Sequence, residues 1–339
     1  MSPELPPSLA TYIDDRVNDL RVLIPKALYD FDSEAIHKAR IATRRLTAAV
    51  RLLHPVLTDS HRKPFERALK KIRQRLGPLR DMDVVLKHLR ELPEFAVHPS
   101  AVSWLSGRLI NRRDEKRDKL GGKSSANKLL GRLGKWWALH AEVDEASKAT
   151  DSLLAESVHL QLDAFAEQAD ALATQSLAET GQSADPHTLR IAGKKLRYTL
   201  ELSVDQGSEL PKAVIKTFKQ MQDELGHWHD MVVLSEAIVD VTIDRQLPHH
   251  DANLAGQIFD MARHAMLRSE RAIANFASQW ASAGPELVIT IRRSFRLTKP
   301  IEYTAVEAAP SEAAPTESKT DPDPSLTDES ADPETPPPT

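Results

Sequence analysis

Two pairs of segments recur along this chain at almost the same spacing, and this repeat constrains the fold more than any other feature. HKARIATRRLTAAV begins at His37, and the similar HTLRIAGKKLRYTL begins at His187, 150 positions later. LGPLRDMDVVL and LGHWHDMVVL align around Gly77 and Gly226, which are 149 positions apart. Two motifs at one offset indicate an internal duplication. We therefore expect two similar halves that face each other about a pseudo-twofold axis.

The rest of the pattern is typical of helices. Apolar residues recur at helical spacing, and no long segment alternates with period two. Asp32 and Asp185 are placed to cap helices, and the Gly77-Pro78 pair predicts a break between two of them. The segment LVITI at 287–291 is the one candidate strand. We expect helices over about 8–30 with an interruption at Pro25, and then over 33–54, 59–76, 79–92, 100–120, a short stretch around 136–137, 152–180, 186–204, 211–225, 228–246 and 250–283.

The composition favours an all-α fold and excludes several kinds of site. Gly is scarce at 12 residues and aromatic residues make up 5%, whereas strands and tight hairpins use both. The chain has no Cys, which excludes disulfides, Cys-ligated zinc, iron–sulfur clusters and thiol nucleophiles. No apolar run approaches the ~20 residues that cross a membrane. The N-terminus lacks a secretory leader pattern, so we expect a cytoplasmic protein without a membrane partner.

Charge is distributed unevenly along the chain. The formal net charge is -4, but residues 299–339 hold ten acids and two bases, so this tail carries -8 and the body carries +4. Residues 300–339 are rich in Pro, Ser, Thr and acids and poor in large apolar side chains, so we expect a disordered tail. A body of such modest charge needs local clustering to bind a polyanion.

Basic residues gather in one narrow stripe on four predicted helices, opposite an apolar face. Each copy of the first motif contributes a stripe, a basic pair adds a second cation beside it, and the following helix carries a further basic stripe. The candidate binding residues are His37, Arg40, Arg44, Arg45, Arg51, Lys63, Arg67, Lys70 and Arg80 in the first half, and His187, Arg190, Lys194, Lys195, Arg197, Lys212, Lys216, Lys219 and His229 in the second.

A solvated face is the ordinary interpretation of a charged stripe, and the two His residues could instead be core histidines. Three observations favour an anionic partner. Few acids stand near the cations, with Glu34 and Glu66 the exceptions; Arg and His dominate the first helix; and the pattern occurs in both copies. Closely spaced cations repel one another. Facing stripes would line a positive channel, where Arg offers a fork for phosphate oxygens and Lys a mobile charge.

The segments HKARIATRRL, LGPLRDMDVVL, HTLRIAGKKLRYTLEL and MQDELGHWHDMVVL resemble the signature segments of CHAD domains, the conserved-histidine α-helical domains, over about residues 8–283. The resemblance implies two four-helix bundles, about 8–122 and 150–283, and binding of inorganic polyphosphate in a basic central pore. Members of the family occur with polyphosphate granules or fused to a CYTH triphosphatase domain. The family's basic positions map onto His37, Arg40, Arg44, Arg45, His187, Arg190, Lys194 and Lys195, while Gly193 departs from the first copy, where Thr43 stands.

The function that these features favour is non-catalytic polyphosphate binding, without a cofactor or a metal, with proteins of polyphosphate granules as candidate partners. One alternative is a phosphohydrolase that uses His229, Asp230 and a divalent metal. However, residues two apart on a helix point about 200° apart, and the chain has no ExExK triphosphatase pattern. Another alternative is a nucleic-acid binder, which is disfavoured because the stripes lack the aromatic residues on which bases stack.

Overall fold

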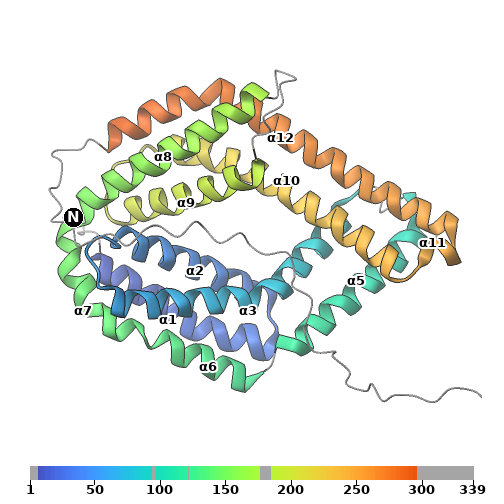
Figure 1. The fold of residues 1–339 in the computed structure, drawn as a ribbon, viewed down its shortest axis with the longest axis horizontal. Coiled ribbons are helices and arrows are strands. Elements are labelled where there is room, and N and C mark those ends of the chain that lie inside the picture. The colour runs from blue at the N-terminus through green and yellow to red at the C-terminus, as the bar shows by residue number, and fades with distance from the viewer. Residues whose placement is uncertain (1–6, 94–96, 121, 176–184, 296–339) are drawn as a thin grey trace, which may run out of the picture. The chain divides into compact units, whose positions relative to one another are not determined.

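The computed structural model describes residues 7–93, 97–120, 122–175 and 185–295, and every regular element in these ranges is a helix (Figure 1). The fold is therefore all-α, as predicted. The elements are α1 (Leu9–Pro25), η1 (Lys26–Asp30), α2 (Ser33–Leu52), α3 (Asp59–Glu91), α5 (Pro99–Leu120), α6 (Lys123–Leu133), α7 (Trp136–Ala146), η2 (Ser147–Ala149), α8 (Thr150–Gln175), α9 (Pro186–Asp205), α10 (Lys212–Asp244), α11 (Leu247–His250) and α12 (Ala252–Ser294). The tail at 300–339, predicted to be disordered, lies outside the described residues.

Three apolar clusters hold these helices together. The first joins α1, α2, the N-terminal part of α3, α6 and α7. The second joins α8, α9, the N-terminal part of α10 and the C-terminal part of α12. The third joins the far ends of α3 and α10 to α5 and the N-terminal part of α12, and we call it the shared cluster because both halves of the sequence contribute to it. Burial of these apolar side chains is the main favourable contribution to folding.

The predicted helix caps are present at the start of both helices that carry the first motif. Asp32 accepts a hydrogen bond from the backbone N–H of Ala35, at 2.5 Å, and begins α2. Asp185 accepts from the backbone N–H groups of His187 and Thr188, at 2.9 and 3.1 Å, and begins α9 with Pro186 in the first turn. These bonds satisfy backbone donors that have no partner inside a helix.

Two predicted helix breaks are wrong. α3 runs without interruption through Gly77-Pro78, and α10 runs through Gly226, so each is one helix of 33 residues. Pro78 removes one backbone hydrogen bond, but buried residues continue on both sides of the site, with Leu76 in the first cluster and Met82 in the shared cluster. Packing against two clusters thus outweighs the local preference of Gly and Pro for a break.

The C-terminal helix is also longer than predicted. α12 continues through Pro285 to Ser294, and the candidate strand at 287–291 is helical. Leu287 and Ile291 lie four residues apart on one face and are buried in the second cluster, which is the spacing of a helix. The segment around Trp136, where only a short helix was expected, forms α6 and α7.

The two halves share an order of elements. α2 and α9 each have 20 residues, and each is followed by a 33-residue helix, α3 or α10. The internal duplication and the division into bundles at 8–122 and 150–283 remain predictions from the sequence.

Candidate functional site

The four helices that carry the basic stripes meet where the two halves of the sequence face each other. α2 packs against α9, and α3 packs against α10, so each stripe-bearing helix contacts one from the other half (Figure 1). The apolar faces of α2 and α9 are buried through residues such as Leu46 and Leu196. Burial of those faces turns the basic side chains of α2 and α9 away from the apolar clusters.

The first half contributes one histidine and three arginines, which are His37, Arg40, Arg44 and Arg80. Burial lowers the pKa of His37, and the nearby charges of Arg80, Arg44 and Arg40 lower it further. These three arginines therefore lie close enough to His37 to repel a proton from its ring. Only Glu34 opposes them among the main contributors.

Arg40 is held against α3 by the backbone. Its Nη1 donates to the carbonyl oxygen of Arg73 at 3.0 Å, and its Nη2 lies 3.8 Å from Asp81 Oδ1. Gly77 makes this approach possible, because a Cβ there would lie 3.0 Å from Arg40 Nη1. The Arg40 side chain is 17% exposed, so part of the guanidinium still reaches solvent.

The second half contributes a matching set on α9 and α10. Burial, and after it the charges of Arg190 and Arg44, lower the pKa of Lys194 to about 6, while Asp230 acts in the opposite direction. Burial also lowers the pKa of His229 to about 4, with Arg190 as the next cause. In a positive and partly desolvated environment, the neutral forms of these groups are favoured.

An electrostatic interaction links the two halves, because the charge of Arg44 on α2 lowers the pKa of Lys194 on α9. The rings of His187 and His229 lie 5.8 Å apart on the second-half side. We use the name central cation group for His37, Arg40, Arg44, Arg80, His187, Arg190, Lys194 and His229. Basic residues of α2, α3, α9 and α10 thus act on one another electrostatically.

A groove between α2 and α3 gathers more of the predicted residues. It has a volume of about 300 Å³ and is lined by Thr47, Arg51, Lys63, Glu66, Arg67, Lys70 and Arg73. Arg73 is fixed by donating to Thr47 Oγ1 at 2.7 Å, and Lys63 pairs with Asp59 at 2.7 Å. Arg51 also lowers the pKa of Lys195, after burial. We call this the α2–α3 groove.

Other predicted residues stand outside these two groups. Arg45 pairs with Glu201 of α9 at 3.1 Å, which joins the halves but neutralises its charge. Arg197 acts on Lys194 but also lies 3.5 Å from Glu201. Three predicted binding residues are exposed on α10 and belong to neither group: Lys212, Lys216 and Lys219.

Four residues near the site are not among the predicted binding residues. His88 Nε2 of α3 lies 3.2 Å from Asp230 Oδ2 of α10 and joins the halves a second time. Asp81 lies 3.8 Å from Arg40, and Asp230 acts on Lys194 and His229. The sequence signal for both was their matching position in LGPLRDMDVVL and LGHWHDMVVL. Arg73 lies three residues after Lys70, one turn further along the same helix. Sequence alone did not show that it faces α2.

The residues suspected of binding a metal do not come together with other ligands. Among the described residues, no group of three or more His, Asp or Glu side chains is placed to hold a metal ion. Asp230 is engaged instead by His88, whose hydrogen bond lowers its pKa against the effect of burial.

A family model described as the CHAD domain matches residues 11–239. The structure is similar to that of the CHAD domain from the plant Ricinus communis, with a TM-score of 0.52, 18% identity and coverage of 87% of this chain and 94% of that one. It is also similar to PptA from Streptomyces chartreusis, with a TM-score of 0.51, 16% identity and coverage of 80% and 98%. A search of curated protein sequences found no match. None of the described helices combines the length and the apolar character needed to cross a membrane.

Proposed function

Because the chain belongs to the CHAD domain family, we propose that it binds inorganic polyphosphate through the central cation group and catalyses no reaction there. Family membership supports a polyphosphate-related role. The observation that carries the proposal is the electrostatic effect of Arg44 on Lys194, because it shows that basic side chains from both halves lie close together. Charging Lys194 beside Arg44 in a partly buried position costs free energy, which an anionic ligand would offset.

The chemistry of the group suits a chain of closely spaced phosphates. Arg40, Arg44 and Arg190 stay charged at any physiological pH and offer planar forks for pairs of oxygens. Lys194 adds a charge that returns when an anion approaches. Such contacts would release counterions from the polyanion and make binding sensitive to salt.

The α2–α3 groove extends the proposed site along the first half. Arg51, Arg67 and Lys70 line it, and Arg51 also acts on Lys195 of α9, so the groove begins where the two halves meet. We propose that a long chain continues into this groove, and that the exposed lysines at 212, 216 and 219 attract it at longer range. Association with polyphosphate granules in the cytoplasm is part of the same proposal.

The test removes two charges from the centre and compares a matched loss elsewhere. Arg44→Gln with Arg190→Gln is expected to weaken affinity for long-chain polyphosphate at least tenfold, because a hydrogen bond to a charged group contributes about 1.5–3 kcal/mol. Lys128→Gln with Arg132→Gln removes equal charge from exposed positions on α6, and less than a twofold change is expected. Titration calorimetry at fixed salt provides the affinities, and circular dichroism checks the helices.

Three results would contradict the proposal. Equal weakening in both double variants would mean that overall charge, and not the central cation group, determines binding. DNA that competes as well as polyphosphate would indicate a nucleic-acid binder. Phosphate release after addition of a divalent metal would indicate a phosphohydrolase.

A further inference from the structure

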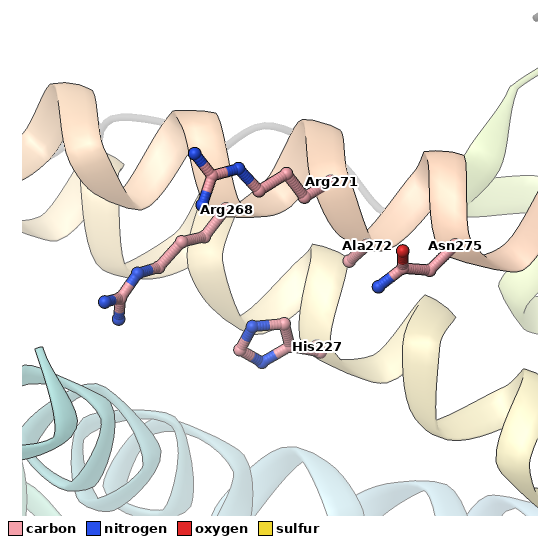
Figure 2. A pocket seen from close by; sticks show the side chains of 5 residues that line it. All are labelled: His227, Arg268, Arg271, Ala272 and Asn275. Carbon is pink, nitrogen blue, oxygen red and sulfur yellow. The ribbon is translucent and has the colours of Figure 1, made fainter.

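A second basic hollow lies between α10 and α12, away from the residues proposed to bind polyphosphate. It has a volume of about 190 Å³ and is lined by His227 of α10 and by Arg268, Arg271, Ala272 and Asn275 of α12. Figure 2 shows both arginines extending from α12 toward the same end of the hollow, with the His227 ring beneath them. We call it the α10–α12 hollow.

The two arginines of this hollow lack the ion pairs that neighbouring arginines make. Two other arginines of α12 form ion pairs: Arg263 pairs with Asp260 at 3.1 Å, and Arg292 pairs with Asp163 of α8 at 2.5 Å. Within the described ranges, neither Arg268 nor Arg271 forms an ion pair with an acid. They stand three residues apart, so their like charges face one another on the helix surface. This is an arrangement that a bound anion would stabilise.

Polar donors complete the hollow. Asn275 Nδ2 donates to Glu224 Oε2 at a long 3.4 Å, so the amide is only weakly engaged. Burial lowers the pKa of His227, and His88 and Arg268 lower it further, while Glu224 and Asp230 act in the opposite direction. The lowered pKa favours the neutral ring, which carries one N–H that can donate. Ala272 adds no bulk to the wall between the two helices.

The hollow is distinct from the central cation group. Asp230 and His88 stand between them, because Asp230 bonds to His88 at 3.2 Å and the His88 ring lies 6.0 Å from the His227 ring. Asp230 is also the carboxylate that acts on Lys194 and His229 from the other side. A phosphate chain that left the central cation group in this direction would meet a carboxylate before it met Arg268.

We propose that the α10–α12 hollow binds a single phosphate-class oxyanion, either free or as the terminal group of a phosphate chain. Two guanidinium forks, an amide and an imidazole line a space of only about 190 Å³, and this donor set matches the oxygens of one tetrahedral anion. The proposal does not depend on the function of the central cation group.

The test follows the His227 ring by NMR in the full-length protein while inorganic orthophosphate is added at constant ionic strength. The ring is labelled with ¹³C-histidine, and His227→Gln identifies its signal. A saturable shift is expected in the wild type. In Arg268→Gln with Arg271→Gln, apparent affinity is expected to fall at least tenfold. Arg292→Gln with Arg293→Gln removes equal charge from the end of α12 and is expected to change affinity less than twofold.

The remaining arms separate the source of the anion from the existence of the site. If long-chain polyphosphate shifts the His227 signal and competes with orthophosphate, the hollow binds the terminal phosphate of a chain. If orthophosphate still shifts the His227 signal while polyphosphate is bound to the protein, the hollow binds a free anion. Arg44→Gln with Arg190→Gln is expected to leave the orthophosphate response intact even if polyphosphate binding is lost. No saturable shift, equal loss in the Arg292 and Arg293 control, or loss of the response in the central variant would each overturn the proposal.

Discussion

Lys194 offers the sharpest test of the proposed site, because its amine is held neutral in the free protein. Burial, Arg190 and Arg44 lower its pKa to about 6. At pH 7.5 only about 3% of the free protein therefore carries this proton. A polyphosphate in contact with the amine would favour the charged form and return the pKa toward its ordinary value. Binding should then take up about one proton at this site.

This proton uptake makes affinity depend on pH with a defined sign and slope. Between about pH 6.5 and pH 9 the bound state holds a proton that the free state lacks, so affinity falls roughly tenfold for each pH unit. Titration calorimetry at pH 7.5 in two buffers of different ionisation enthalpy counts the protons. Lys194→Arg keeps the charge but does not titrate in this range, so its uptake should be about one proton smaller. Equal uptake in the two proteins would refute the reasoning.

The same residue affects the stability of the free protein. The unfolded chain keeps the Lys194 proton up to its ordinary pKa of 10.5, whereas the folded chain releases it near pH 6. The unfolded state therefore binds more protons within this window, and the free energy of unfolding rises with pH there. Thermal denaturation should show this rise in the wild type relative to Lys194→Gln, which has no proton to release. Parallel curves for the two proteins would contradict the assignment.

Three further predictions concern packing, the contact between halves and the tail. Gly193→Ala should destabilise the fold by about 1–3 kcal/mol in denaturant titrations, because the added Cβ would lie 1.9 Å from Gln222 Nε2. Adding Gln222→Ala should recover part of the lost stability. Gly226→Ala should instead stabilise the fold by up to about 1 kcal/mol, because a Cβ there meets open space. A double-mutant cycle on Arg45 and Glu201 should give a coupling of about 0.2–1 kcal/mol that shrinks in salt, and a larger salt-independent value would contradict the half-exposed geometry. Deleting residues 300–339, which removes ten acids and one base and hence a net charge of -9, should maintain or raise polyphosphate affinity, and a large loss would make the tail part of the site.

The sequence predicted the local features of the fold well. Asp32 and Asp185 cap helices because a cap depends on a few neighbouring residues, and the all-α class follows from a period that runs along most of the chain. The breaks at Gly77 and Gly226 failed because helix continuity there depends on distant packing. Leu76 and Met82 belong to different apolar clusters. Their packing partners lie far away in the sequence, so a pattern of neighbouring residues does not reveal what keeps the helix continuous between them.

The candidate site shows the same limit. A helical wheel places Arg40, Arg44 and Lys194 away from the apolar faces, and this needs only the sequence of each helix. The wheel cannot show that Arg45 meets Glu201, or that Arg73 reaches Thr47 across α2 and α3. Those partners depend on the angle and register at which two helices pack. Whether the predicted residues bind polyphosphate stays a prediction.

The shared cluster has a consequence for the order in which the molecule can be made. Its first-half residues lie between Met82 and Leu109, but their partners on α10 and α12 extend from Met231 to Ala265. A ribosome must add more than a hundred residues before these partners exist, and at about 5–20 residues per second this takes on the order of ten seconds. During that interval the apolar ends of α3 and α5 on the nascent chain lack their final partners. Cotranslational folding of the first half therefore leaves an exposed apolar surface, which is the kind of surface that chaperones bind.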